Sequence, residues 1–191
     1  MSSSLRDSLT GAPPVQVLHC NLNEQGIWPG PEHGAPAAVG SKAGVGANLN
    51  FPMPTSEGDA AYCYTFNKFI FPDLAAFDPV RPPQAALAKA ALANVMAHVT
   101  VHVTAQELVF VACGLDAMAG DPYATMAVTP GWYGWLAAEL ASGAWRYAGA
   151  ASTASTLPVV FNLEGGYNAR KCSVAVGKVV SSASLQSLRV V

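Results

Sequence analysis

Two short segments bring polar side chains to the ends of apolar runs. Residues 111–122 (VACGLDAMAGDP) close one apolar run and carry Asp116 and Asp121. Residues 157–167 (LPVVFNLEGGY) close another run and end on Tyr167. A carboxylate at the end of a buried strand either completes a turn or holds a ligand, and both interpretations stay open for Asp116. For Asp121, which precedes a proline, a structural Asp-Pro turn is favoured.

The elements that position these residues alternate along the chain. We expect strands at residues 15–21, 48–51, 108–113 and 157–163. We expect helices at residues 59–77, from Thr129 through Leu140, and from Asn168 onward. This alternation is typical of a parallel, doubly wound α/β sheet. Because ligands bind beyond the carboxyl ends of such strands, Asp116 and Tyr167 share the candidate functional edge.

Three residues predict how the helices begin and end. Asp59 is expected to cap the first helix, and Thr129 is expected to cap the second, with a proline in its first turn. Pro72 lies inside the first helix, so we expect that helix to end or kink near residue 71.

Two segments do not fit the alternation. Residues 80–106 separate FDP from ELVFVACG, where a crossover usually takes only a few residues. They suit an inserted helix, and the codons of their first Val and last Gln are compatible with translated intron sequence. Within them His98 and His102 have the spacing of metal ligands on a helix, but HVTVHV alternates like a strand, which is favoured. Residues 142–156 are expected to form a low-complexity surface loop.

Composition narrows the class of protein. The chain has 191 residues, of which 51% are hydrophobic and 12% charged, so we expect a globular domain. A formal net charge of −2 without a dense basic run argues against direct nucleic-acid binding, and no apolar stretch is long enough to span a membrane. The four scattered cysteines indicate buried free thiols in a reducing compartment, the nucleus or cytoplasm, with an organelle left open.

Six fragments then carry a family resemblance. They are VLHCNLNEQGIWPGPEHG, GVGANLNFPMP, GDAAY, ELVFVACGLDAMAGDP, VTPGWY and LEGGYN. Their types and order resemble the C-terminal portion of the catalytic domain of zinc-dependent histone deacetylases and acetylpolyamine amidohydrolases, and LEGGY is closer to class II. The resemblance implies an α/β fold of the arginase/deacetylase type, as a partial domain over residues 15–191 with a mainly parallel sheet flanked by helices. Residues 1–14 are expected to be disordered.

The resemblance also implies chemistry. It implies hydrolysis of acetyl-lysine-type amides with Zn²⁺, on acetylated proteins in chromatin regulation or on polyamines. By resemblance, Asp116 is a metal ligand and Tyr167 is the catalytic hydrogen-bond donor to the substrate carbonyl. Trp28 stands where relatives have Phe and would line the acyl-lysine channel, next to which Gly165 and Gly166 let backbone approach.

Some family residues are missing. The chain contains no Asp-x-His motif and no adjacent histidine pair, and Asn23 stands where relatives have a histidine, so a monovalent-cation site is in doubt. We therefore expect the chain to be inactive alone. Three interpretations stay open: a truncated enzyme, a noncatalytic binding or regulatory module, and a split fragment that needs a partner chain. An exposed sheet edge would favour such a partner or self-association.

Overall fold

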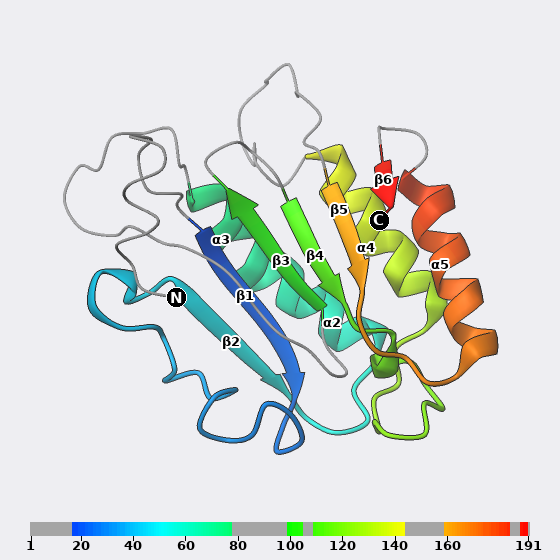
Figure 1. Cartoon of the computed structure of the whole chain (residues 1–191), viewed down its shortest axis with the longest axis horizontal. Helices are drawn as coiled ribbons and strands as arrows, with labels where there is room; N and C mark the ends of the chain where they lie inside the picture. The colour runs from blue at the N-terminus through cyan, green and yellow to red at the C-terminus, as the bar shows by residue number, and fades with distance from the viewer. Residues whose placement is uncertain (1–16, 78–98, 105–108, 144–158, 184–187, 191) are drawn as a thin grey trace, which may run out of the picture.

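The computed structural model describes residues 17–77, 99–104, 109–143, 159–183 and 188–190. Within these ranges the strands are β1 (Val17–Glu24), β2 (Asn48–Met53), β3 (Val99–Thr104), β4 (Val109–Cys113), β5 (Val159–Leu163) and β6 (Leu188–Val190). They form one sheet in the order β2-β1-β3-β4-β5-β6 (Figure 1). The pairs β1/β2, β4/β5 and β5/β6 are parallel, whereas β3 runs antiparallel to both its neighbours. The prediction of an α/β fold with a mainly parallel sheet is confirmed.

The helical elements connect these strands. They are α2 (Asp59–Thr65), the π-helix η2 (Phe66–Ile70), α3 (Phe71–Ala76), α4 (Pro130–Ser142) and α5 (Ala169–Ala183), with short 3-10 turns η1 (Lys42–Gly44) and η3 (Leu115–Ala117). In Figure 1, α2, α3 and α4 lie behind the sheet. Among the described helices, none is both long and apolar enough to cross a membrane.

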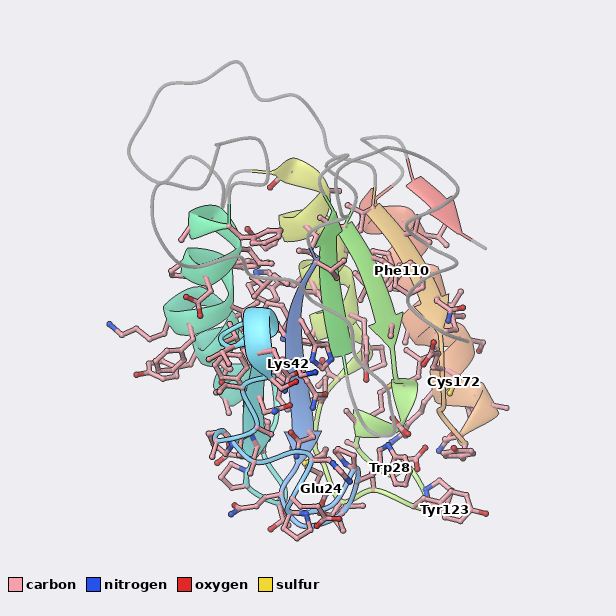
Figure 2. All side chains as sticks on the ribbon, turned by 60° about the vertical axis from the view of Figure 1, so that its left-hand side comes forward. Glu24, Trp28, Lys42, Phe110, Tyr123 and Cys172 are labelled. Carbon is pink, nitrogen blue, oxygen red and sulfur yellow. The ribbon has the colours of Figure 1, made fainter. Side chains whose placement is uncertain are left out.

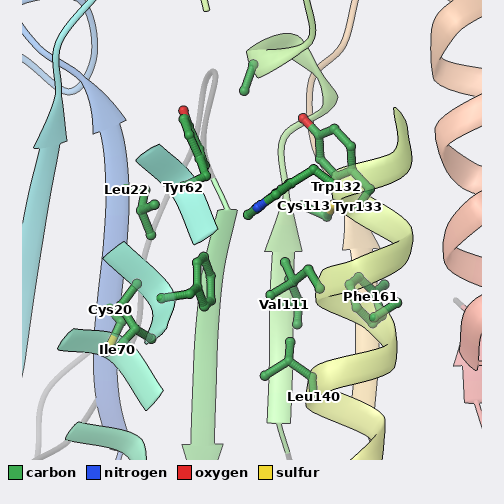
Figure 3. Close-up of a cluster of buried hydrophobic side chains, with 14 of the residues drawn as sticks. Cys20, Leu22, Tyr62, Ile70, Val111, Cys113, Trp132, Tyr133, Leu140 and Phe161 are labelled. Carbon is green, nitrogen blue, oxygen red and sulfur yellow. The ribbon is translucent and has the colours of Figure 1, made fainter. Parts of the chain in front are cut away.

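The core lies between the sheet and these helices. Alternate residues of β1 and β4 are buried on this face: Leu18, Cys20, Leu22, Val109, Val111 and Cys113. They meet an aromatic cluster, in which Tyr62 and Trp132 stand edge to face with ring centroids 5.1 Å apart (Figure 3). On the opposite face Asn21, Asn23 and Ala112 are also buried, and burial on both faces is typical of strands in a parallel sheet.

The first helical segment continues past its proline. Pro72 was expected to end or kink the helix, but residues 59–76 are helical throughout. Pro72 has no N–H to donate back to Lys68. The preceding turn widens into a π-helix and the chain then resumes an α-helix, which is how helices commonly absorb such a defect.

Of the two N-cap residues predicted, one stands at the N-cap position of its helix. The N-cap of α2 is Gly58, so the prediction that Asp59 caps this helix is wrong. The Asp59 carboxylate instead accepts hydrogen bonds from the backbone N–H of Thr129 at 2.7 Å and from its hydroxyl at 2.6 Å. Thr129 is the N-cap residue of α4, as predicted, but its side chain serves this bridge. Asp59 therefore ties the beginnings of two helices together.

Two strands differ from expectation. β2 continues through Pro52 to Met53. This is possible because β2 is the outermost of the described strands, and among them Pro52 pairs with Asn23 of β1 alone. Residues 99–104 of the expected inserted helix form β3, as their alternating pattern favoured. The rest of that insertion lies outside the described residues, as do the predicted disordered N-terminus (1–14) and residues 144–156 of the predicted loop. Ser142, placed in that loop by prediction, is the last residue of α4.

Candidate functional site

Asp116 and the Gly165–Tyr167 segment leave the sheet from neighbouring strands. β4 and β5 are parallel and end opposite each other, with Cys113 paired to Leu163. The backbone N–H of Glu164 then donates to the carbonyl of Cys113 at 3.0 Å, which keeps the two chains together past the strand ends. Asp116 follows in η3 and is 1% exposed. The predicted convergence of these segments at one sheet edge is therefore present.

Two glycines pack directly on the Asp116 segment. Gly165 has φ +80°, and a Cβ placed on it would lie 2.7 Å from the Asp116 carboxylate oxygen Oδ2. Gly166 has φ +105°, and its Cβ would lie 2.6 Å from the Cβ of Leu115 and 2.9 Å from the sulfur of Cys172. A side chain at either position would need a disfavoured backbone conformation and would also clash. The Gly-Gly pair is thus required for Asp116 to be enclosed by the turn that presents Tyr167.

Asp121 holds the same turn from the other side. Its Oδ1 accepts a hydrogen bond from the backbone N–H of Tyr123 at 2.9 Å, the local turn that the sequence predicts. Its Oδ2 accepts a second one from the backbone N–H of Tyr167 at 2.8 Å. Asp121 is 8% exposed, so these charge-assisted bonds are sheltered from water. No local sequence signal marks this second role of Asp121, because its partner Tyr167 is 46 residues away.

The Tyr167 phenol sits at the rim of the site. Its side chain is 40% exposed, and its ring packs edge to face against Tyr123 with centroids 4.7 Å apart. Partial desolvation raises the pKa of the Tyr167 phenol, and the nearby carboxylates of Asp116 and Asp121 raise it further. A raised pKa keeps the phenol protonated at neutral pH. Tyr167 is therefore a hydrogen-bond donor, not an anion, under ordinary conditions.

The start of α5 adds two tethers to the loop after η3. The side-chain amide of Asn168 donates to the carbonyl of Gly120 at 3.2 Å, and the ammonium of Lys171 donates to the carbonyl of Ala119. These contacts join the loop that carries Asp121 to the helix that follows Tyr167. The loop is therefore fixed by backbone and side-chain bonds together.

A buried tyrosine supports the strand end that precedes Asp116. The Tyr133 hydroxyl donates to the carbonyl of Gly114 at 2.9 Å, and its side chain is 0% exposed. Burial raises the pKa of Tyr133 well above its ordinary value, and the neighbouring Cys113 raises it further. The hydroxyl consequently stays protonated and keeps donating to the turn that begins at Gly114.

All four cysteines are free, as predicted, but two are not buried. Cys20 and Cys113 are buried, whereas Cys63 and Cys172 are partly exposed because they lie on helix faces at the edge of the core. Burial raises the pKa of the Cys172 thiol, and the charges of Asp121 and Asp116 also raise it. A raised thiol pKa disfavours the reactive thiolate.

Trp28 lies at the same end of the sheet, on the loop after β1. Its side chain is 48% exposed. Figure 2 shows Glu24, Trp28 and Tyr123 gathered at this end. β3 lies between β1 and β4, so the strand that leads to Trp28 is two places from the strand that leads to Asp116. The structure thus brings Asp116 and the Gly165–Tyr167 segment together, whereas Trp28 reaches the same end of the sheet on a loop that starts from β1.

A buried glutamate joins these two parts. Glu24, the last residue of β1, is 0% exposed. Its carboxylate accepts hydrogen bonds from the backbone N–H of Thr125 at 3.2 Å and from the Thr125 hydroxyl. Thr125 belongs to the loop that also carries Asp121. No local motif marked Glu24, because its partner is 101 residues away.

Asn23, which precedes Glu24, stands where the family that the sequence resembles has a histidine. Asn23 is 3% exposed, and its side-chain oxygen lies 3.4 Å from the donating amide of Asn21. The same amide donates to Asn50 at 3.0 Å, and Asn50 donates in turn to the carbonyls of Ala35 and Ala38 at 3.1 Å. These side-chain hydrogen bonds hold the loop after β1, which carries Trp28, against the strands β1 and β2.

The described residues do not complete a metal site. Among them, no group of three His, Cys, Asp or Glu side chains could hold a metal ion. His19 contacts Asn48 at the opposite end of β1, and His33 pairs with exposed Glu32 at 3.8 Å. His102 lies on a strand, so the helical spacing considered for it does not apply, and His98 lies outside the described residues. The described residues therefore do not supply, around Asp116, the roughly three protein ligands that a catalytic zinc needs.

Comparison with known sequences gives consistent matches. The family model described as "Histone deacetylase domain" matches residues 10–81 and 81–183. Histone deacetylase HDA1 of Candida albicans is 31% identical over 172 residues, which are 86% of this chain and 16% of that protein. Histone deacetylase 14, chloroplastic, of Arabidopsis thaliana is 27% identical over 170 residues, which are 89% of this chain and 31% of that protein. The chain therefore spans less than a third of the length of either relative.

Comparison with solved structures agrees. The histone deacetylase Clr3 structure superimposes with a TM-score of 0.63 at 26% identity, covering 89% of this chain and 23% of that one. Acetylpolyamine aminohydrolase from Burkholderia pseudomallei has a TM-score of 0.60 at 21% identity, covering 87% of this chain and 37% of that one. At 21% identity, the match to acetylpolyamine aminohydrolase shows a similar fold and nothing further.

Proposed function

Because the chain belongs to the histone deacetylase family, we propose that it supplies one part of a site that hydrolyses acetyl-lysine-type amides. The observation that supports this proposal is the packing of the Gly165-Gly166 turn, which Tyr167 follows directly, on the buried Asp116 segment. A donor phenol suits the polarisation of an amide carbonyl, and a buried carboxylate at a rigid sheet edge suits a metal ligand.

The residues take the following roles in this proposal. Tyr167 is the catalytic donor, and its protonated phenol hydrogen-bonds to the substrate carbonyl and to the oxyanion that develops from it. Asp121 is a positioning residue, because it holds the Tyr167 backbone. Trp28 flanks the acyl chain, while Gly165 and Gly166 let the backbone approach it.

Zinc is the cofactor that the family resemblance implies, and Asp116 would be one of its ligands. When bound, zinc polarises a carbonyl and lowers the pKa of a bound water. The described residues offer Asp116 without the two further ligands that such a site needs. We therefore propose that this chain is catalytically inactive on its own and that other protein groups must complete the site.

This incompleteness favours a second candidate, a noncatalytic binding or regulatory module, or a fragment that works with a partner chain. In either case the ligand we propose is an acetylated protein or polyamine, in the nucleus or cytoplasm. We further propose that residues 15–191 act as one partial domain. Its edge strand β2 is the surface for self-association or for a partner.

A complementation assay separates these functions. The chain is mixed with zinc, an acetyl-lysine peptide and a separate polypeptide that carries an Asp-x-His motif and an adjacent histidine pair from a family member. We expect no turnover from the chain alone, turnover in the mixture, and loss of that turnover with Tyr167→Phe. No turnover in the mixture, with acetyl-peptide binding retained, supports the binding module.

Turnover by the chain alone with zinc, abolished by Asp116→Ala, would contradict the proposed incompleteness. Turnover in the mixture that Tyr167→Phe leaves unchanged would contradict the role of Tyr167. Ser181→Ala, at an exposed position near the C-terminal end of α5, is the control for changes caused by mutation in general.

A further inference from the structure

β3 is the irregular member of the sheet. β1, β2, β4, β5 and β6 all run in one direction, whereas β3 runs against them and separates β1 from β4. Figure 1 shows it as the strand between these two. β3 belongs to the segment at residues 80–106 that interrupts the expected crossover.

The pairing registers on the two sides of β3 align β1 with β4. Cys20 is the partner of Val101, and Val101 is the partner of Val111. In the same way Asn21 and Ala112 both pair with residue 100. Because β3 is antiparallel to both neighbours, β1 and β4 are parallel to each other. Across β3, the residues of β1 and β4 that share a partner stand at the same level along the strands.

The two strands also present matching faces. The residues that face the helices are buried in both strands and stand level across β3: Leu18 with Val109, and Cys20 with Val111. A shift of one residue would turn every side chain of a strand to the wrong face. β1 and β4 need no such shift, so they are already suited to pair directly.

The connection is also long enough without the insertion. Removal of residues 80–106 would leave residues 78, 79, 107 and 108 between Phe77, the C-cap of α3, and Val109, the start of β4. Connections of about 2–6 residues are usual between a helix and a following strand.

We propose that β3 is a removable wedge strand, and that the chain without residues 80–106 pairs β1 directly with β4 in a sheet whose described strands are all parallel. The wedge keeps β1 and β4 two strand spacings apart, about 10 Å, instead of one spacing of about 4.8 Å. Presence or absence of the segment therefore sets the distance between the ends of β1 and β4.

This distance has a consequence that rests on the proposed function. Trp28 follows β1, whereas Asp116 and Tyr167 follow β4 and β5. Without the wedge, the end of β1, from which the Trp28 loop starts, moves one strand spacing toward the end of β4. The segment at residues 80–106 then sets the spacing between the strands that lead to Trp28 and to Asp116.

Disulfide trapping tests the pairing itself, without zinc or substrate. Val111→Cys is combined with native Cys20 in a background of Cys63→Ser, Cys113→Ala and Cys172→Ser, with and without residues 80–106. Disulfides require Cα atoms less than about 7 Å apart. We expect a disulfide between Cys20 and position 111 in the majority of molecules that lack residues 80–106. In the full chain we expect this disulfide at background level.

A matched pair controls for geometry and folding. Val111→Cys with Phe161→Cys, in the same background with Cys20→Ala, joins β4 to its direct neighbour β5 and should cross-link in both chains. Backbone NOEs on the chains with all native cysteines give a second measurement: they should connect β1 to β4 in the deleted chain, and each of them to β3 in the full chain.

Two results would overturn the wedge: a Cys20 link in the full chain, or no link and no β1–β4 NOEs in the deleted chain while the control pair forms. Since neither readout involves catalysis, failure of the proposed function leaves the wedge intact. Failure of the wedge likewise leaves the roles of Asp116 and Tyr167 untouched.

Discussion

The carboxylate of Asp121 accepts a hydrogen bond from the backbone N–H of Tyr167 at 2.8 Å, across 46 residues of sequence. The same carboxylate closes its own turn at Tyr123. One buried charge therefore fixes both aromatic residues at the rim of the site, and the position of the candidate catalytic phenol depends on it.

Removal of this carboxylate should loosen the Tyr167 turn. Asp121→Ala leaves two backbone N–H groups without their acceptor, so we expect the free energy of unfolding to fall by about 2–4 kcal/mol. Chemical denaturation measures the loss, and hydrogen exchange at the Tyr167 amide should accelerate. Glu32→Gln, at an exposed ion pair, is the control and should change stability by less than about 0.5 kcal/mol. An unchanged Tyr167 amide would show that the bond does not hold the turn.

The glycine turn should not tolerate side chains. Gly165→Ala and Gly166→Ala each combine positive φ with a Cβ closer than 3.0 Å to its neighbours. We expect a loss of about 2–4 kcal/mol for each in thermal or chemical unfolding. Gly177→Ala in α5 is the matched control, since its Cβ would meet nothing within 4 Å, and it should stabilise by up to about 1 kcal/mol. Equal effects at the three positions would contradict the described packing.

Two buried tyrosines should respond oppositely to loss of the hydroxyl. The Tyr133 hydroxyl donates to Gly114, whereas the Tyr62 hydroxyl is buried and has no hydrogen-bond partner among the residues that the structure describes. Tyr133→Phe should cost about 1–3 kcal/mol, because it leaves a buried carbonyl unsatisfied. Tyr62→Phe should be neutral or stabilising, because it removes an unsatisfied polar group. Denaturant midpoints of the two variants decide the matter, and a larger loss for Tyr62→Phe would reverse the assignment.

Stability should fall at alkaline pH. Burial raises the pKa of Cys113 and of Tyr62 above their ordinary values of 9.0 and 10.0. Their folded pKa values exceed the unfolded ones, so the stabilisation is complete below pH 9 and is lost as the pH rises toward the folded values. Each group contributes at most about 1.4 kcal/mol per pH unit to this decline.

Unfolding curves between pH 8 and 12 check this expectation. Tyr62→Phe should make the decline above pH 10 shallower, because one buried phenol no longer ionises on unfolding. Tyr64→Phe, at a side chain that is 61% exposed, is the control. A decline of equal slope in wild type and Tyr62→Phe would assign the alkaline loss to other groups.

Local sequence signals predicted much of the fold. The apolar runs that became β4 and β5 were recognisable because both are buried on the helix face. Thr129 and Pro130 predicted the start of α4, because threonine is favoured at the N-cap of a helix and proline at its first position. Gly165 and Gly166 both adopt positive φ, but the expectation that they let backbone approach the acyl-lysine channel stays a prediction.

Features that depend on distant partners were not predictable in this way. Asp121, Glu24 and Asp59 all bond backbone groups far away in sequence, and nothing in their own neighbourhoods distinguishes these roles from turns and caps. The direction and place of β3 depend on two strands that bracket it in space. Its alternating pattern shows a strand but carries no information about which neighbours it separates.

Zinc binding by the purified chain decides whether the chain assembles a metal site alone. Because Asp116 supplies one ligand of an incomplete site, dialysis against zinc followed by metal analysis should find much less than one zinc per chain, unchanged in Asp116→Ala. One tightly bound zinc per chain that Asp116→Ala removes would contradict the claim that this chain does not assemble the site alone.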